Sequence, residues 1–319
     1  MPDIIGYGST CLDLALNLPS MPVPDDRTEL NEMSWQYGGT ISNGLCQAAV
    51  LGAGSIGMVG LIGGSIGELC LNDLKYHGID TSQMIHTETG ENRLTIVLSY
   101  LDTGKRSFLG RPKTMRSLLE VDIDTAYMDG AKLIYVNRSE PGVIKAAKYA
   151  HEHGIKVLMD CDIATPTIKE LLSYVDYAIS SEKCFRTLFP DLSEREGIEE
   201  FRKLCADHAL MIVTLGERGL IGVDDDGYFD VPAFKVNVAD TSGCGDVFHG
   251  AFIAGVMRGL ENRENARFSS AVSAIKATVV GCHAGLPTRN VVEKFLETGE
   301  IDDTEIMKRR EHYRRMPFV

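Results

Sequence analysis

The segment Asp240-Thr241-Ser242-Gly243-Cys244-Gly245-Asp246 combines a glycine loop with a carboxylate, and an apolar helical pattern follows at once. Two glycines around one small residue let consecutive backbone N–H groups turn toward one point, and the first helical turn adds its own unpaired N–H groups. Such a loop is suited to bind an anion. Asp246 lies in that first turn, where it can accept the proton of a substrate hydroxyl while the amides of residues 243–246 hold the charge of a transferring phosphoryl group.

The same residues also fit an ordinary helix start. Asp240 or Ser242 would then cap the helix, and Asp246 would only complement the positive end of the helix dipole. Cys244 has two interpretations as well. A thiol at a helix N-terminus can have a lowered pKa and act as an oxidisable brake, whereas a small buried residue would simply fill space.

The segment resembles the signature of the PfkB (ribokinase-like) carbohydrate kinases, usually Asp-Thr-x-Gly-Ala-Gly-Asp before an apolar helix. In that family the last Asp is the catalytic base and the preceding amides form an anion hole. The resemblance therefore assigns these roles to Asp246 and to Gly243, Cys244 and Gly245. Cys244 replaces the usual Ala, and because a thiol fits the space of that Ala, we expect catalytic activity to survive.

Two N-terminal segments resemble the sugar-binding elements of the family. Residues 4–13 form a short apolar strand, a glycine turn and a carboxylate, and Gly38-Gly39-Thr40-Ile41-Ser42-Asn43 precedes a helix of small residues. The resemblance makes Asp13, Gly39 and Asn43 substrate-binding residues. In physical terms, glycines let the backbone approach a ligand closely, and Asn offers a donor and an acceptor to a diol. Without the resemblance, these segments are a strand end and a loop with a helix cap.

The nucleotide side resembles the family too. Residues 211–219 form a buried strand that ends in Thr-x-Gly, similar to the segment that lines the nucleotide in these kinases, and the loop 281–287 resembles the adenine-side closure. The resemblance covers nearly the whole chain and implies ATP as cosubstrate. It assigns ATP binding to the following residues: Thr214, Gly216, Gly219, Gly243 and Gly245.

The metal motif of the family is altered in this chain. Ser181 and Cys184 stand at the two positions of the usual Asn-x-x-Glu, which leaves Glu182 as the candidate to place Mg²⁺ and its waters. Mg²⁺ is still expected, because the charge on the transferring phosphate of ATP must be neutralised. By analogy with the family, a monovalent cation such as K⁺ would lie near Asp240 and Ser242 and shape the anion hole.

Apolar runs alternate with helical patterns along the chain, which predicts an α/β fold with a doubly wound, mostly parallel sheet flanked by helices. A helix is predicted from Gly142 to His153, where alanines and Val143 recur at helical spacing. The resemblance implies one ribokinase-like kinase domain over residues 1–319. The predicted strands are Ile4 to Gly8, Ser55 to Val59, Leu133 to Val136, Val157 to Asp160, Tyr177 to Ile179 and Met211 to Leu215.

A hairpin is predicted where Leu94, Ile96 and Leu98 alternate with other residues and the turn signal Asp102-Thr103-Gly104 follows. With the extended stretch before residue 37, it resembles the family's β lid, here about 14–37 and 92–112, which covers the sugar and often pairs with a second subunit. An ordinary edge hairpin is the alternative, but a mostly apolar ribbon needs something to pack against. We therefore expect a homodimer formed through the lid.

Composition excludes some classes of partner. The formal charge of −13 on 319 residues disfavours nucleic acid and anionic membrane surfaces. The eight cysteines are scattered without a Cys-x-x-Cys pair, which indicates reduced thiols and a cytoplasmic protein. No apolar run approaches the length of a membrane span. The basic run Lys308 to Arg315 fits either an acidic partner surface or a solvated last helix.

Three arginines are candidates to bind an anionic group of the substrate. Arg138 follows the carboxyl end of a predicted strand, where ligands of open α/β sheets bind, and Arg106 and Arg111 belong to the predicted hairpin. Each could hold a carboxylate, phosphate or sulfonate, or could be a solvated surface residue. The alternative partner for Arg138 is Glu140.

Similarity to subgroups of the family leaves the charge of the sugar open. Residues 157–163 and 232–236 resemble the sulfofructose kinases, whose substrate is an anionic ketose. Gly39 and Asn43 look more like the ribokinases and ketohexokinases, which take neutral sugars. We predict a kinase that transfers the γ-phosphate of Mg-ATP to a primary hydroxyl of a pentose or ketose.

Two other functions fit parts of the sequence. A nucleoside kinase of the same family would need an aromatic slot, for which Trp35, Tyr37 and Phe108 are candidates, although all three also suit packing within the lid. A non-catalytic sugar-binding or regulatory relative would suit the altered Cys244 and metal motif, whereas the intact Asp246 opposes it. The sequence has neither Gly-x-x-x-x-Gly-Lys nor Gly-x-Gly-x-x-Gly after a strand, which disfavours other nucleotide sites.

Overall fold

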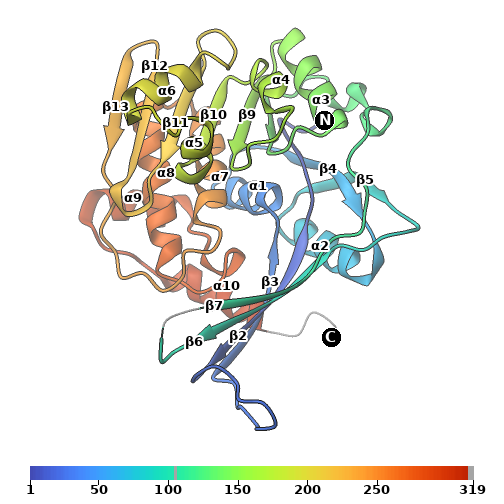
Figure 1. Ribbon diagram of the computed structural model, residues 1–319, viewed down its shortest axis with the longest axis vertical. Helices are drawn as coiled ribbons and strands as arrows, with labels where there is room; N and C mark the ends of the chain where they lie inside the picture. Colours follow the sequence, from blue (N-terminus) through green and yellow to red (C-terminus); the bar gives the residue numbers. More distant parts are fainter. Residues whose placement is uncertain (104–105, 315–319) are drawn as a thin grey trace.

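The computed structural model describes residues 1–103 and 106–314, which form two β-sheets and the helices around them (Figure 1). The larger sheet has nine strands, all parallel to their neighbours except β12 and β13, which pair antiparallel at one end. In spatial order its strands are β13 (Gly227–Val231), β12 (Leu220–Asp224), β11 (Leu210–Thr214), β10 (Tyr177–Ser181), β9 (Lys156–Cys161), β8 (Leu133–Val136), β1 (Ile4–Tyr7), β4 (Ile56–Ile62) and β5 (Asp80–His86).

Helices cover both faces of this larger sheet, so its central strands are continuously apolar. Ile4 of β1 packs into one core and Ile5 into the other. The core with Ile4 is closed by α1 (Thr40–Val50), α2 (Gly64–Tyr76), α7 (Cys244–Arg258), α8 (Asn262–Ala277), α9 (Arg289–Thr298) and α10 (Thr304–Arg314). The core with Ile5 is closed by α3 (Pro141–Glu152), α4 (Ile168–Leu172), α5 (Glu182–Leu188) and α6 (Glu194–Arg202).

The predicted α/β fold is confirmed, and each of the six predicted strands lies in this sheet with its ends displaced by at most three residues. The largest displacement is in β4, which runs on to Ile62. The predicted helix from Gly142 is α3, which starts at Pro141 because proline suits the first helical turn. β5, β12 and β13 were not predicted, since their polar residues and glycines obscure the strand pattern.

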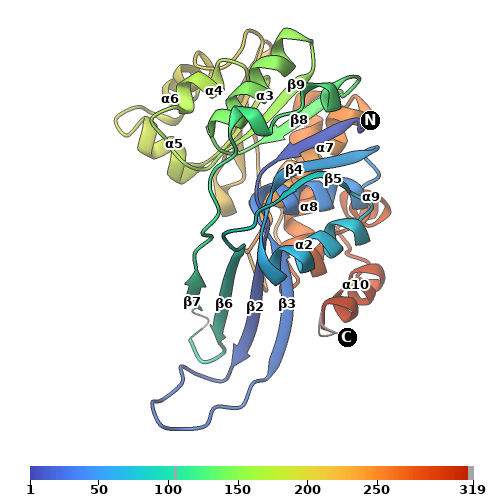
Figure 2. The ribbon, with the colours of Figure 1, turned by 90° about the vertical axis from the view of Figure 1, so that its right-hand side faces the viewer.

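Four strands form a second sheet, hereafter the small sheet, which projects from the body of the molecule (Figure 2). Its order is β3 (Glu32–Gly38), β2 (Cys11–Leu18), β6 (Arg93–Tyr100) and β7 (Arg106–Arg111). The predicted lid segments correspond to these strands, but the first strand begins at Cys11. Asp13 is therefore a strand residue of the small sheet. Gly104 of the predicted turn lies outside the described residues, while β6 and β7 pair antiparallel on either side of it.

Several cations of the basic run from Lys308 form ion pairs within the protein. Arg310 and Arg314 of α10 both pair with Glu32 of β3, and Lys308 pairs with Glu305 one turn away. These bonds engage Lys308, Arg310 and Arg314 within the protein, and Arg315 lies outside the described residues. Among the described residues, no helix has the length and apolarity needed to cross a membrane. All eight cysteines are free thiols.

Candidate active site

A cavity of about 890 Å³ opens where the strand order of the larger sheet changes direction at β1. The chain leaves β1 toward β4 on one side and later returns at β8 on the other, and open α/β sheets bind ligands at such a point, beyond the carboxyl ends of the strands. One face of the small sheet forms a wall of this cavity. The lining includes Ser9, Asp13, Gln36, Gly39, Asn43, Arg93, Thr95, Lys113, Asn137, Arg138, Asp240, Ser242, Gly243, Asp246, Gly281 and Cys282.

Asp246 lines this cavity from the first turn of α7. Asn43, in the first turn of α1, donates a hydrogen bond from Nδ2 to Asp246 Oδ2 at 2.6 Å. Burial, together with the charge of nearby Asp160, raises the pKa of Asp246 to about 6, and the bond from Asn43 opposes this rise. The carboxylate is therefore ionised at neutral pH yet more basic than an exposed aspartate, as a general base requires.

These contacts predict the pH dependence of the reaction. In the wild type kcat/KM should fall as the pH drops below about 6, because protonated Asp246 cannot accept a proton. Asn43→Ala removes a bond that favours the ionised form, so the acid limb of the kcat/KM profile should move to higher pH.

Gln47→Ala is the matched control for this pH prediction. Gln47 lies one turn further along α1 and bonds the carbonyl of Pro287 instead, so its loss should leave the acid limb in place. An acid limb that stays fixed in Asn43→Ala would contradict the role of the bond.

Three residues behind Asp246 are functional candidates that sequence reasoning missed. His249, one turn along α7, donates from Nδ1 to Gly245 O at 2.7 Å, and its Nε2 lies 3.6 Å from Asp160 Oδ1. Burial raises the pKa of Asp160 to about 8 and lowers the pKa of His249. The ring of Tyr135 stacks on the imidazole of His249, with the two ring centroids 5.8 Å apart. One signal in the sequence could have pointed to this group: Asp160 is an acidic residue near the end of an otherwise apolar strand.

Gly243 is the N-cap of α7 and has a φ of 74°, in the left-handed region. A Cβ at this position would lie 2.4 Å from Cys282 Sγ, so the close approach of the two loops requires glycine. Gly245 faces open space. The loop therefore provides a cradle of the kind that suits an anion such as the transferring phosphate of ATP.

Both the backbone amide and the thiol of the neighbouring Cys244 make contacts within the protein. Its amide donates to Thr241 O at 3.2 Å. Its Sγ lies 3.7 Å from Ser273 O on α8. This thiol packs between the loop and α8, in the position of a small packing residue.

Asp240 accepts bonds from the amides of Ser242 and Gly281, each at 2.9 Å. Lys276 of α8 is fully buried, donates to the Asp240 carbonyl at 2.9 Å and places Nζ 3.7 Å from Oδ2. Burial pushes the pKa of Asp240 upward, but Lys276 and the two amides hold it below its usual value. An ammonium group therefore lies beside Asp240, one of the two residues near which a monovalent cation is predicted.

The predicted sugar-binding residues are brought together in the cavity. Asp13, Gly39, Asn43 and Arg138 all line it. Gly39 has a φ of 108°, and a Cβ there would lie 2.3 Å from the carbonyl of Ser9, so only glycine fits.

The other candidate arginines of the hairpin have different surroundings. Arg111 pairs with Glu91 at 2.5 Å, and the side chain of Arg106 lies outside the described residues. Two cations that were not predicted, Arg93 and Lys113, line the cavity with Arg138.

Of the residues predicted to bind ATP, Gly243 lines the cavity, whereas Thr214, Gly216 and Gly219 lie outside its lining along the same edge of the larger sheet. Thr214 ends β11 beside Ser181 of β10, and the turn Gly216–Arg218 follows, closed by Gly219 at φ 92°. Glu182 begins α5 and pairs with Arg218 at 2.5 Å. An exposed ion pair of this kind contributes little stability, so it can open, but it engages the carboxylate proposed to place magnesium.

Residues 1–289 match the pfkB family of carbohydrate kinases. This chain belongs to the PfkB family. Ribokinase of Bacillus subtilis is 27% identical over 307 residues, covering 93% of this chain and 100% of the relative. The 5-dehydro-2-deoxygluconokinase of Geobacillus thermodenitrificans is 26% identical over 320 residues, covering 92% and 93%. The kinase is thus a carbohydrate phosphotransferase.

Solved structures agree with this assignment. Ribokinase of Thermotoga maritima has a TM-score of 0.79 at 25% identity, with 93% of this kinase and 100% of that chain covered. A putative ribokinase II of E. coli, in complex with ATP and Mg²⁺, has a TM-score of 0.80 at 18% identity and shares the fold, with coverage of 93% and 99%.

Proposed function

We propose that this kinase transfers the γ-phosphate of Mg-ATP to a primary hydroxyl of a sugar, with Asp246 as the general base. The observation that carries this proposal is the bond between Asn43 and Asp246 at the wall of the cavity, beside the Gly243 loop. We further propose that residues 1–319 act as one kinase domain, with the small sheet as a lid over the sugar.

Asp246 would accept the hydroxyl proton as the sugar oxygen attacks. The amides of Gly243, Gly245 and Asp246 are oriented by the helix start to hold the equatorial phosphate oxygens, while the Cys244 amide already has Thr241 O as partner. Phosphoryl transfer depends mainly on positioning and charge stabilisation. Water exclusion by the small sheet would limit wasteful hydrolysis of ATP.

The nucleotide would lie along the edge formed by β10 and β11, next to Thr214, Gly216 and Gly219. ATP supplies the transferable phosphoryl group, and Mg²⁺ offsets its charge. The glycine cradle at Gly243 fits a phosphate. Glu182 fits magnesium only after it leaves Arg218, so we assign it the role of orienting the waters of the metal.

The cavity favours an acidic sugar over a neutral one. Arg93 and Arg138 provide cationic side chains, together with Lys113, which also lies 3.9 Å from Glu140 Oε1. Asp13 provides a carboxylate for hydroxyl groups. A nucleoside is less well matched, because Trp35 alternates with the cavity-lining Ser34 and Gln36 on β3 and so belongs to the opposite face. Tyr37 and Phe108 do line the cavity.

The proposal is tested by ADP release from Mg-ATP with ribose, fructose, 5-dehydro-2-deoxygluconate, sulfofructose and adenosine as acceptors. We expect a sugar to be phosphorylated, and an acidic sugar to have the highest kcat/KM. Turnover with adenosine alone would identify a nucleoside kinase. ATP binding without turnover of any acceptor would favour a non-catalytic relative.

We propose that Lys276 supplies the positive charge for which K⁺ was expected at Asp240. Its ammonium group is buried within 3.7 Å of the carboxylate and cannot be exchanged for solvent ions. Activity should therefore be equal in potassium, sodium and choline salts. Lys276→Met should lower kcat by loosening the loop at Asp240, with an unchanged fold by circular dichroism. A requirement for potassium in the wild type would contradict this assignment.

We propose a homodimer formed through the outer face of the small sheet. A row of apolar residues crosses its four strands at paired positions, from Trp35 through Leu14 and Ile96 to Leu109. Leu109 is 57% exposed, and such an apolar face needs cover. Light scattering should give a dimer for the wild type and a monomer for Leu109→Asp. Val121→Asp, at a distant exposed position, should stay dimeric; a monomeric wild type would refute the interface.

A further inference from the structure

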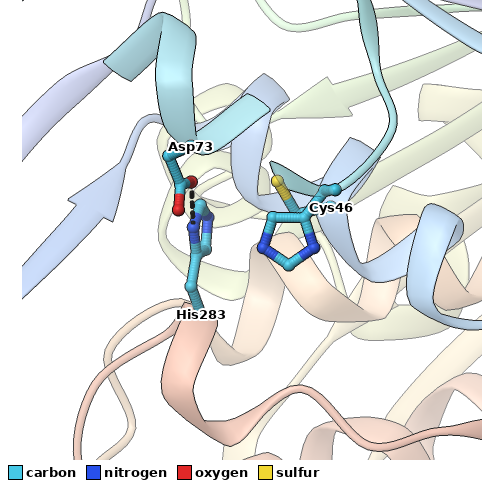
Figure 3. Close-up of side chains that lie close together, drawn as sticks. Cys46, Asp73 and His283 are labelled. Atoms are coloured by element: carbon cyan, nitrogen blue, oxygen red, sulfur yellow. Dashed lines mark hydrogen bonds and ion pairs between the residues drawn. The ribbon is translucent and has the colours of Figure 1, made fainter. Parts of the chain in front are cut away.

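A second cluster of reactive side chains lies outside the residues that line the cavity. Among the described residues, Cys46 of α1, Asp73 of α2, His77 just after α2 and His283 of the 3₁₀ turn η4 (His283–Gly285) each contribute a potential ligand atom. These four atoms all lie within 4.8 Å of one another. Figure 3 shows Cys46, Asp73 and His283 converging from three separate elements.

The hydrogen bonds of this cluster resemble the surroundings of a metal-binding imidazole. His283 Nδ1 donates to Asp73 Oδ2 at 2.8 Å, which fixes the tautomer that keeps a lone pair on Nε2. That Nε2 is buried and has no hydrogen-bond partner, and the residue is 0% exposed. Tyr313 of α10 donates to the other oxygen of Asp73, also at 2.8 Å. A carboxylate that orients a histidine in this way is typical of zinc sites.

The charges of the cluster also suit a divalent cation. His283 and Tyr313 together bond both oxygens of the buried Asp73 carboxylate. The buried Cys46 thiol must lose its proton when it binds a metal. One thiolate, one carboxylate and two neutral imidazoles carry two negative charges in total. A divalent ion would make this buried site neutral.

We propose that Cys46, His77 and His283 bind a divalent cation of the zinc class, with Asp73 as the residue that orients His283. Sulfur and nitrogen donors favour Zn²⁺ or Co²⁺ over Mg²⁺, which prefers oxygen ligands. Three side-chain ligands leave the fourth tetrahedral position to a water. The site lies outside the cavity lining, so we assign the metal a structural role. The ion would hold η4 against α1 and α2, next to Gly281, whose amide bonds Asp240. This site is separate from the Mg²⁺ that accompanies ATP.

The first test uses the wild type without an affinity tag. Protein stripped of metal is titrated with Co²⁺, and its visible and near-ultraviolet spectra are recorded. We expect one equivalent to bind, with a thiolate-to-cobalt charge-transfer band and the absorption of tetrahedral Co²⁺. Addition of Zn²⁺ should abolish both signals and raise the melting temperature, because the ion binds only the folded chain. A wild-type spectrum without a thiolate band would overturn the proposal.

Cys46→Ala tests the ligand set, and Cys70→Ala is its matched control, since both cysteines are buried and neither replacement adds volume. The Co²⁺ thiolate band should disappear in Cys46→Ala and persist in Cys70→Ala. The melting temperature should respond to Zn²⁺ only in the control. An unchanged band in a folded Cys46→Ala would overturn the assignment. The wild-type spectrum decides the question even if a variant fails to fold, and neither readout depends on kinase activity.

Discussion

Asp246→Asn should lower kcat by about 10²–10⁴-fold, the usual contribution of a general base, while the protein remains folded. Asn has the same shape as Asp and can still accept the bond from Asn43 through its amide oxygen. It cannot take the proton of a sugar hydroxyl. The loss should appear in kcat with each accepted sugar, while the affinity for ATP changes little.

Stability measurements separate this catalytic loss from a folding defect. The pKa of Asp246 is raised from 3.8 to about 6, so ionisation of this group favours the unfolded state, and its contribution to stability is lost as the pH rises through about 6. Replacement by a neutral amide removes that penalty. Urea unfolding at pH 8 should therefore show Asp246→Asn to be at least as stable as the wild type.

Asp226→Asn, in an exposed turn, is the control for charge and should retain full activity. Near-native turnover of Asp246→Asn would exclude the carboxylate as the base. A variant that loses both turnover and stability would instead indicate a structural role.

Gly243→Ala should reduce kcat about 10²-fold or more, an effect comparable with the loss of a donor from an oxyanion hole. Two physical causes contribute to this loss of kcat. The added Cβ would overlap Cys282 Sγ at 2.4 Å, and alanine is strained at a φ of 74°. The loop must shift away from Cys282, and the amides that hold the phosphate then lose their common orientation. Steady-state kinetics with saturating ATP and sugar measure the effect.

Gly259→Ala provides a closely matched control for that substitution. Gly259 ends the same helix with a φ of 73°, and its added Cβ would meet nothing within 4 Å. Both variants should lose about 1–2 kcal/mol of unfolding free energy from the left-handed conformation. Only Gly243→Ala should lose activity. Equal activity of the two variants would show that the loop tolerates the shift and that the cradle is not required.

The sequence predicted the site best at positions where the backbone conformation allows only one residue type. The glycines at 39 and 243 have positive φ values and close neighbours, so a glycine pattern directly reports a constraint that no other residue meets. Regular alternation along β6 likewise predicted a strand of the hairpin, and in the structure Thr95 and Val97 of that strand line the cavity. These features are local, and a single chain is enough to reveal them.

Features created by tertiary packing could not be predicted in this way. Lys276 lies in an ordinary helical pattern, and only the packing of α8 on the loop at Asp240 makes it a buried cation. His249 and Asp160 are far apart in the sequence and meet only because α7 crosses the end of β9. The cluster of Cys46, Asp73, His77 and His283 has no metal-like spacing, because its members come from three distant segments.

The bond between Asn43 and Asp246 also sets when the kinase can first become competent during synthesis. It joins residues 203 positions apart, and the cavity draws its lining from Ser9 to Cys282. Contacts of such long separation form late, since the intervening chain must first be ordered. Ribosomes would thus complete α1 and all nine strands of the larger sheet before α7 can dock, and nascent chains that end before α7 lack Asp246. With Asp246 as the proposed base, such incomplete chains would be unable to spend ATP on a sugar.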